Sequence, residues 1–231
     1  MGIDLIVPVI QYTQELDLTL ASCADYKDQI HIVIKSKCSD RKLIECIDYY
    51  RDSGLHITLQ VEDDDGIYSA INQGLRKVIG THVLVLGVGD LLTTHFGKVI
   101  EFLRNDTVVV SPVLLCGKDG SKKLYSGRLT PSHQGIVYPT HIFKNLEYRE
   151  EFRIISDRIL YDHVSKMVGL KFHAVGFPIS EFQLTGISSD KAGRLIILKE
   201  SLMHLKEEPR FRNVLRFVSS LLSYLRMQGR K

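Results

Sequence analysis

The sequence predicts an α/β protein with an open, mixed and mainly parallel sheet flanked by helices, followed by a helical C-terminal extension. Short β-rich runs alternate with helical patterns over the first half of the chain. Crossovers of this kind join parallel strands in a right-handed sense. From about residue 190 to the end the pattern is helical only. We therefore expect an α/β domain over residues 1–190 and a helical extension over residues 191–231.

The expected elements alternate in order. We expect strands at residues 3–10, 30–35, 56–61, 81–87 and 107–115. The expected helices cover residues 14–26, 39–53, 68–79 and 94–104. Gly54 is a typical end for the second helix. Residues 116–127 are rich in Gly, Lys and Ser and predict a hairpin or loop. Residues 130–190 mix short strands and helices, and Pro209 divides the extension into two helices.

Composition narrows the class of protein. The 231 residues are 44% hydrophobic and 25% charged, which is typical of a soluble globular protein. The net charge of +3 is too small to indicate a nucleic-acid partner. The four cysteines lack metal-site spacing and predict reduced thiols in a cytoplasmic protein. The first residues predict a strand and not a signal peptide, and no apolar run has the length of a membrane span.

Acidic side chains gather in the loops that follow the expected strands. These loops cover residues 11–14, 36–40, 62–66 and 87–90, and the last three contain carboxylates. Ligands of parallel sheets bind beyond the carboxyl ends of the strands, so these loops are the expected site. Four consecutive acids, Glu62 to Asp65, open a helix. One interpretation is helix N-terminal charge. Four acids repel one another, so the other interpretation is a ligand site or a solvated loop.

The most distinctive segment carries a family resemblance. The pattern D-x-G-I-Y-x-A-x-N-x-G, followed by a strand that ends in G-V-G-D, resembles the inverting glycosyltransferase family 2, in particular its bacterial polysaccharide-assembly branch. Its matching residues are Asp64, Gly66, Ile67, Tyr68, Ala70, Asn72, Gly74 and Asp90. Residues 132–138 resemble the H-Q-x-x-x-Y element of the family, residues 153–160 its catalytic-base segment, and residues 186–188 its closing G-I-S.

The resemblance implies a GT-A fold and an activity. The protein would move a hexosyl or N-acetylhexosaminyl group from a nucleoside-diphosphate sugar to a saccharide acceptor, with inversion. The acceptor would be lipid-linked, in lipopolysaccharide or capsule biosynthesis. Asp157 would be the catalytic base, and His133 and Gln134 would contact a sugar. Asp90 would also bind Mn²⁺ or Mg²⁺ at the diphosphate. The implied donor-binding residues are Asp40, Asp64, Tyr68, Asn72, Gly89 and Asp90.

Several of these residues also have a structural interpretation; His133 and Gln134 could be a satisfied polar pair that lines a loop. Asp90 suits a turn or a helix N-cap, and Asp157 suits the N-cap of a helix over residues 158–168. The ring of Tyr68 suits the core. Asn72 could hydrogen-bond across the loop that bears Asp90. Asp162 lies five residues beyond Asp157 and is less suited to act as the base.

Two lysines depart from the family pattern. Lys35 and Lys37 stand where acids are usual, and Ser69 replaces another acid. A lysine can only donate hydrogen bonds, so it cannot accept one from a nucleobase imide, although it could meet a phosphate. A catalytically degenerate GT-A-fold protein that binds nucleotide or sugar is therefore the alternative. A nucleotidyltransferase is less suited, because residues 6–14 contain no glycine.

The C-terminal segment predicts a basic amphipathic helix. Residues 209–231 contain no acid, and apolar residues recur at three- and four-residue steps. The cations are Arg210, Arg212, Arg216, Arg226, Arg230 and Lys231. One interpretation is docking on an anionic membrane, at the inner face of the plasma membrane. The other is a helix packed on the core with solvated arginines.

Overall fold

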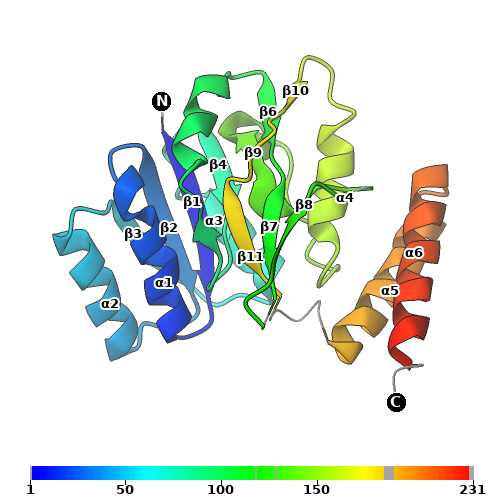
Figure 1. Cartoon of the computed structure of the whole chain (residues 1–231), viewed down its shortest axis with the longest axis horizontal. Coiled ribbons are helices and arrows are strands. Elements are labelled where there is room, and N and C mark those ends of the chain that lie inside the picture. The colour runs from blue at the N-terminus through cyan, green and yellow to red at the C-terminus, as the bar shows by residue number, and fades with distance from the viewer. Residues whose placement is uncertain (1, 118, 128, 185–189, 229–231) are drawn as a thin grey trace.

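The architecture is an α/β domain with a helical hairpin beside it (Figure 1). The computed structural model describes residues 2–117, 119–127, 129–184 and 190–228. Its seven-stranded sheet has the order β10-β6-β9-β4-β1-β2-β3. These strands are β1 (Ile3–Val9), β2 (Ile30–Ser36), β3 (Ile57–Val61), β4 (His82–Val85), β6 (Thr107–Val110), β9 (Ile136–Pro139) and β10 (Lys171–Ala174).

Most pairs in this sheet are parallel. β1 pairs in parallel with β2 and β4, β2 with β3, and β6 with β10. Only β9 runs the other way, between β4 and β6. The buried strands are rich in β-branched residues, as two-sided burial requires. The predicted open, mixed and mainly parallel sheet is confirmed.

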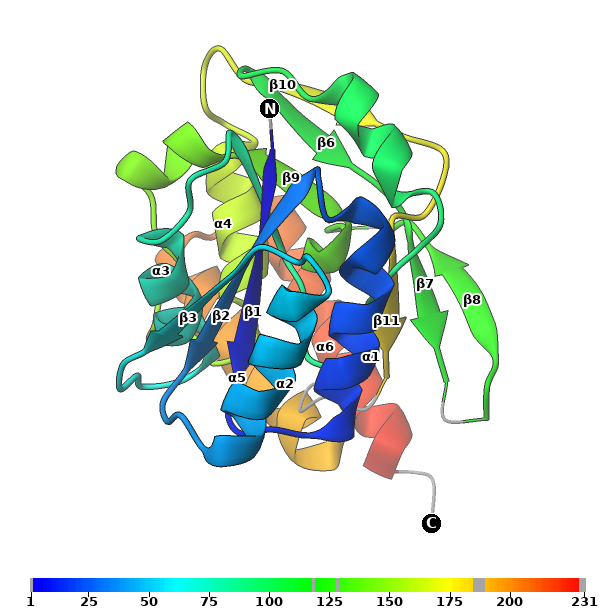
Figure 2. The same ribbon diagram turned by 90° about the vertical axis from the view of Figure 1, so that its left-hand side faces the viewer.

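A smaller sheet lies next to the first (Figure 2). Its order is β5-β11-β7-β8, with β5 (Leu91–Leu92), β7 (Val113–Cys116), β8 (Lys122–Tyr125) and β11 (Ser180–Gln183). The single strand predicted over residues 107–115 is therefore wrong. It divides at Pro112 into β6 and β7, because proline has no N–H to donate to a strand ladder. β7 and β8 form the hairpin that the composition of residues 116–127 predicts.

Helices cover both faces of the large sheet. α1 (Gln14–Cys23) and α2 (Arg41–Asp52) lie in front of β1–β3 in Figure 2, and α3 (Ile67–Leu75) and α4 (Ser156–Val164) lie behind. Leu16 and Leu43 anchor the first pair in the larger apolar core. Ile71 and Leu160 anchor the second pair in another. The sheet is thus packed between two layers of helices, and the loops that follow its strands lie at its edges.

Three predicted helices differ from the structure. The helix expected over residues 94–104 is a 3₁₀ helix (Phe96–Phe102), in which Gly97 and β-branched residues have low helix propensity. α3 ends at Leu75, because the N–H groups of Ile79 and Gly80 donate to the carboxylate of Asp4 instead. α4 begins at Ser156 and not after Asp157. Further 3₁₀ turns are Ala24–Tyr26, His133–Gly135 and Thr140–Lys144.

The extension is a hairpin of two helices divided at Pro209, as predicted. α5 (Lys191–Glu207) and α6 (Phe211–Gln228) lie side by side at one end of the molecule (Figure 1). Arg194 Nη1 donates to Ser223 Oγ at 3.0 Å, and the Ser201 and Ser220 hydroxyls meet at 3.2 Å. Among the described residues, no helix combines the length and the apolar character that crossing a membrane requires.

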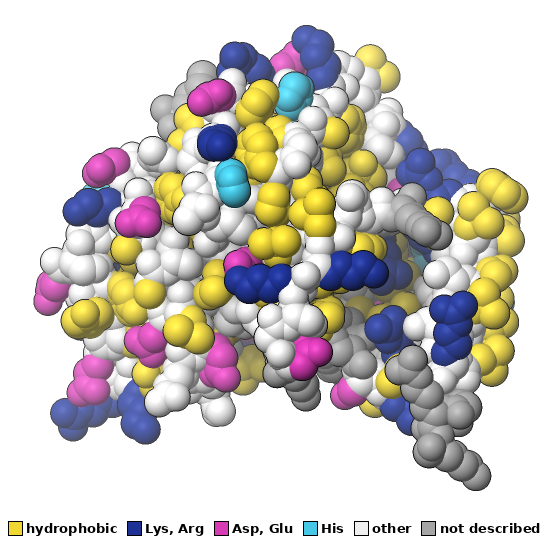
Figure 3. Space-filling view, in the orientation of Figure 1, with side chains coloured by type: hydrophobic (Ala, Val, Ile, Leu, Met, Phe, Trp, Pro, Cys, Tyr) yellow, Lys and Arg dark blue, Asp and Glu magenta, His cyan; other side chains and the backbone are white. Residues whose placement is uncertain are grey.

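α6 is turned so that its polar side faces the protein. Asn213 and Arg216 are only 3% and 6% exposed. Its apolar side faces outward and forms a column along the right-hand edge of Figure 3. The exposed apolar face consists of Phe211, Val214, Leu215, Val218, Leu222 and Leu225. α6 does pack on the protein, but the interpretation with solvated arginines is wrong for Arg216, which is buried against Asp162.

Candidate active site

The predicted loops share one edge of the large sheet. β1, β2, β3 and β4 are mutually parallel, so the residues that follow them emerge on the same side. The loops after β2, β3 and β4 contain Asp40, Asp64 and Asp90. The 3₁₀ turn with His133 and Gln134 and the start of α4 with Asp157 reach the same region through side-chain contacts with α3 and with Asp90.

Asp90 is held in place by three N–H donors. Oδ2 accepts from Gly87 N at 3.0 Å and Gln134 Nε2 at 3.1 Å, and Oδ1 accepts from Gln183 N at 3.0 Å. The residue is 3% exposed. Burial raises the pKa of Asp90 to about 6, while the three hydrogen bonds act in the opposite direction. Asp90 is therefore a buried turn residue that ties β4 to β11 and to the His133–Gly135 turn.

These contacts limit what Asp90 can offer a cation. A carboxylate has about four acceptor positions, of which three are occupied here. In the described ranges there is no group of three or more His, Cys, Asp and Glu side chains that could hold a metal ion. The residues present do not make a cation site by themselves; Asp90 has one acceptor position to contribute.

Asp157 is bonded to the family-like segment at α3. The Tyr68 hydroxyl donates to Ile154 O at 2.6 Å and lies 3.2 Å from Asp157 Oδ1. The Tyr68 ring is buried and stacked on Tyr148, so its interpretation as core is confirmed. Asp157 is the second residue of α4, and Ile155 is the N-cap. The N-cap interpretation of Asp157 is therefore wrong; its half-buried carboxylate lies in the first turn of α4, where the helix dipole favours an acid.

His133 and Gln134 have different surroundings. His133 Nδ1 is buried and has no hydrogen-bond partner within the described part of the chain. Burial lowers the pKa of His133, and the nearby charge of Asp157 partly opposes this. Gln134 donates to Asp90 and accepts from the Ser132 hydroxyl. Its amide is thus engaged within the protein, whereas His133 retains a free ring nitrogen near Asp157.

Lys35 forms a buried ion pair with Asp64. Its ammonium group donates to Asp64 Oδ2 at 2.9 Å, Glu62 O at 2.5 Å and Ser36 O at 3.2 Å. The Lys35 side chain is 0% exposed. Burial raises the pKa of Asp64, but the bonds from Lys35 and from Gly66 N outweigh it and the net pKa is lowered. All three ammonium hydrogens have acceptors, so the idea that Lys35 meets a phosphate is wrong.

The remaining predicted residues have structural partners. The Asn72 amide donates to Tyr148 O at 2.8 Å and Glu150 Oε1 at 2.9 Å, so the expected bond across the loop of Asp90 is wrong. Asp40 is the N-cap of α2 and accepts from Leu43 N at 2.9 Å. Gly89 has φ +90°, a value that favours glycine. The segment 186–188 lies outside the described residues.

Sequence reasoning missed one carboxylate that supports the site. Glu200 of α5 is buried and accepts hydrogen bonds from the N–H groups of Arg153, Ile154 and Ile155, just before Asp157. A glutamate in a helical segment ordinarily indicates a solvated surface. Its one sequence signal is its position three residues after Ile197, which packs on the same part of α4.

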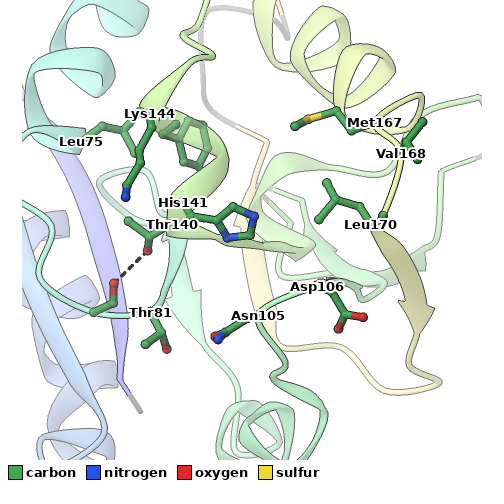
Figure 4. Close-up of a pocket in the computed structure, with 13 residues that line it drawn as sticks. Leu75, Thr81, Asn105, Asp106, Thr140, His141, Lys144, Met167, Val168 and Leu170 are labelled. Carbon is green, nitrogen blue, oxygen red and sulfur yellow. Dashed lines mark hydrogen bonds between the residues drawn. The ribbon is translucent and has the colours of Figure 1, made fainter.

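A cavity of about 750 Å³ lies at the opposite edge of the sheet (Figure 4). Its walls come from the residues before β4, β6 and β10, and from those after β9, including Thr81, Asp106, His141, Lys144 and Leu170. In Figure 4 the His141 ring lies between Thr140 and Leu170. None of the family-like residues lines this cavity. It is a surface hollow remote from the carboxyl ends of β1–β4.

Comparisons with known proteins agree with the fold. The family model for glycosyl transferase family 2 matches residues 4–168. No curated protein matches the chain. S. aureus TarS 1-349 has a TM-score of 0.69 and 15% identity, over 99% of this chain and 74% of that chain. Its complex with UDP-GlcNAc has the same score and identity, over 99% and 75%.

A second solved protein has a similar fold. The mannosyltransferase PcManGT from Pyrobaculum calidifontis, in complex with GDP-Man and Mn²⁺, has a TM-score of 0.68 and 11% identity. The match covers 99% of this chain and 75% of that chain. At these identities the structures show the fold alone, and the family model shows the family. The chain is a glycosyltransferase that belongs to glycosyl transferase family 2.

Proposed function

We propose that this glycosyltransferase moves a hexosyl or N-acetylhexosaminyl group from a nucleoside-diphosphate sugar to a saccharide acceptor, with inversion at the anomeric carbon. The observation that carries the proposal is the contact between distant family-like segments. Tyr68 of the D-x-G-I-Y segment is bonded to Asp157, and Gln134 is bonded to Asp90. The donor class is supported by similar structures in complex with UDP-GlcNAc and GDP-Man.

In the proposed reaction Asp157 is the general base. An acceptor hydroxyl oxygen attacks the anomeric carbon, and Asp157 takes the hydroxyl proton. The bond from that carbon to the β-phosphate oxygen breaks, and its electron pair leaves with the nucleoside diphosphate. Tyr68 orients the carboxylate through Oδ1, which leaves Oδ2 for the acceptor. A base in this position contributes about 10²–10⁴-fold to the rate.

The loop of residues 87–90 is the proposed binding site of the donor diphosphate. A Cβ at Gly87 would lie 2.8 Å from Asp90 Oδ2, so glycine lets the Asp90 carboxylate fold back onto this loop. Asp90 would give one oxygen to Mn²⁺ or Mg²⁺, and the donor phosphates and water would supply the other ligands. When bound, such a cation offsets the charge that develops on the leaving group. A weak, donor-dependent cation site follows from the single acceptor position of Asp90.

An activity assay tests the proposed base. The protein is incubated with sugar nucleotides, Mn²⁺ and lipid-linked saccharide acceptors, and the anomeric configuration of the product is determined by NMR. Asp157→Asn should lower kcat by about 10²–10⁴-fold, because the amide cannot take the proton. Asp106→Asn, at an exposed ion pair remote from the site, is the matched control. Equal turnover by Asp157→Asn and wild type, or a retained configuration, would contradict the assignment.

A second candidate function is donor or nucleotide binding without catalysis. The buried Lys35–Asp64 pair and the three donors on Asp90 favour it, because they satisfy carboxylates that would otherwise meet ligand. Calorimetry with UDP and GDP, with and without Mn²⁺, measures nucleotide binding, and the activity assay measures transfer. The two measurements together distinguish a binding protein from an enzyme. Nucleotide binding with no turnover of any donor would support the binding protein. Transfer that Asp157→Asn abolishes would support the enzyme.

The exposed face of α6 supports a membrane-bound acceptor. Six apolar side chains lie outward on this helix, from Phe211 at 77% exposure to Leu225 at 53%. Arg210 and Arg226 are exposed near its two ends, so the charge of the face complements an anionic lipid surface. The face of α6 docks on such a surface, where the enzyme acts in cell-surface polysaccharide biosynthesis. Arg216 takes no part, because it is buried against Asp162.

Vesicle flotation tests the docking of α6. Wild type should float with phosphatidylcholine vesicles that contain phosphatidylglycerol, and less with phosphatidylcholine alone. Leu222→Ser with Leu225→Ser should lose flotation, because it removes apolar area from the exposed face. Leu124→Ser with Leu184→Ser, at two exposed leucines outside α6, is the matched control. Self-association through α6 in sedimentation analysis, with no flotation, would assign this face to a second copy and contradict membrane docking.

A further inference from the structure

A buried carboxylate from the extension meets the start of α4. Glu200 Oε1 accepts from Arg153 N at 2.6 Å, and Oε2 accepts from Ile154 N at 3.0 Å and Ile155 N at 3.1 Å. The residue is 5% exposed. The N-cap of α4 has no side-chain capping bond of its own. Glu200 therefore supplies, from another helix, an anion where the helix dipole favours one.

The same short segment is held from a second direction. The Tyr68 hydroxyl donates to Ile154 O at 2.6 Å and also contacts Asp157 Oδ1. The N–H groups of residues 153–155 thus point to α5, and the carbonyl of Ile154 points to α3. Asp157 follows two residues after this doubly held segment. Its position depends on where the backbone enters α4.

The extension is attached to α4 along its length. Ile197 packs with Phe152, Ile155 and Ile159 in one buried cluster. One helical turn from Ile197, Glu200 makes its three bonds. At the other end of α4, Arg216 of α6 pairs with Asp162, with Nη2 3.0 Å from Oδ1. α4 is therefore fixed by the extension at both ends.

We infer that Glu200 is a positioning residue for Asp157, so that the extension is part of the catalytic unit. The inference rests on the proposed function of Asp157. Glu200 acts through the backbone of residues 153–155 and does not touch the reacting atoms. Removal of its carboxylate takes the acceptor from three N–H groups, of which that of Ile155 is buried, and the entry to α4 must shift to reach others. A misplaced base lowers the rate of the chemical step more than it weakens donor binding.

Steady-state kinetics of four variants test the inference. Glu200→Ala should lower kcat by about 10²-fold, with the KM for donor within about twofold. Glu200→Gln keeps the shape and one acceptor, so its kcat should lie between those of wild type and Glu200→Ala. Glu207→Gln, on the same helix in an exposed pair with Arg149, is the control and should match wild type. Asp157→Asn reports on the proposed function in the same assay.

Amide hydrogen exchange gives a readout that does not need activity. Glu200→Ala should speed exchange at residues 153–155, whereas Glu207→Gln should not, and both should leave exchange in β1 unchanged. Two results would overturn the inference about Glu200 but not the proposed function. One is unchanged amide exchange at residues 153–155 in Glu200→Ala. The other is a wild-type kcat for Glu200→Ala when Asp157→Asn is inactive. Full activity of Asp157→Asn would overturn the proposed function. Equal losses in kcat and donor affinity would assign Glu200 a merely structural role.

Discussion

Lys35 is the residue that sets this site apart from the family pattern. Its ammonium group is wholly enclosed, and three acceptors take its three hydrogens. A buried charge of this kind is tolerated only with a close partner of opposite sign, which is Asp64. The lysine therefore fixes the loop after β3 and is not itself available to a ligand. The Asp64 carboxylate at this edge is likewise engaged by the lysine.

Removing one member of the Lys35–Asp64 ion pair should lower the stability of the folded protein. Lys35→Met should lower the free energy of unfolding by about 3 kcal/mol at pH 7, because it leaves Asp64 buried without its partner. Lys37→Met removes a half-exposed lysine whose Nζ lies 3.4 Å from Asp64 Oδ1. It should lower the free energy of unfolding by less than about 1 kcal/mol. Urea unfolding measures both. A Lys35→Met protein as stable as wild type would show that the pair does not hold the loop.

At the scale of elements, α4 and α6 meet through a buried ion pair. Asp162 accepts from Arg216 and, at 3.2 Å, from the more exposed Arg212. Burial raises the pKa of Asp162, but the bonds and charges of the two arginines outweigh it and lower the pKa below the usual 3.8. Two cations that the sequence assigns to a solvated or lipid-facing side thus attach α6 to the α/β domain.

The pair predicts how stability varies with pH. A carboxylate with a lowered folded-state pKa stabilises the protein above its unfolded pKa, and this contribution is lost as the pH falls through the folded value. Asp162→Asn should lower the free energy of unfolding by about 3 kcal/mol at pH 7 and at pH 5. The difference from wild type should shrink below pH 3.8. Urea unfolding across this range measures it, with Asp48→Asn, in the exposed pair with Arg51, as the control. A difference that does not depend on pH would contradict the ion pair.

For the whole molecule, local patterns predicted the alternation of β1 to β4 with helices, because each strand and helix has its own periodicity. The second sheet escaped prediction, since its edge strand β5 has only two residues and pairs with β11 far along the chain. The candidate site residues were chosen from their motif, which did not predict their hydrogen-bond partners. The Asp90 carboxylate accepts a hydrogen bond from the N–H of Gln183, 93 residues away. Every residue except proline has a backbone N–H, so sequence patterns do not indicate which one donates.

The orientation of α6 shows a related limit. Its apolar periodicity predicts an amphipathic helix but not which side faces the protein. Here Asn213, Arg216 and Ser220 face inward and the apolar residues face outward. The choice depends on buried polar partners such as Asp162, which belong to another helix. Tertiary contacts thus decided both the place of the extension and its link to the segment that bears Asp157.

A crystal structure of the protein soaked with UDP or GDP and Mn²⁺ tests the central claim most directly. The claim is that the loops at the carboxyl edge of β1–β4 receive the diphosphate of a sugar donor. The expected density places the diphosphate against residues 87–90, with Asp157 facing the site of the β-phosphate. Nucleotide bound instead in the cavity of His141 and Lys144, or no nucleotide at millimolar concentration, would contradict the account.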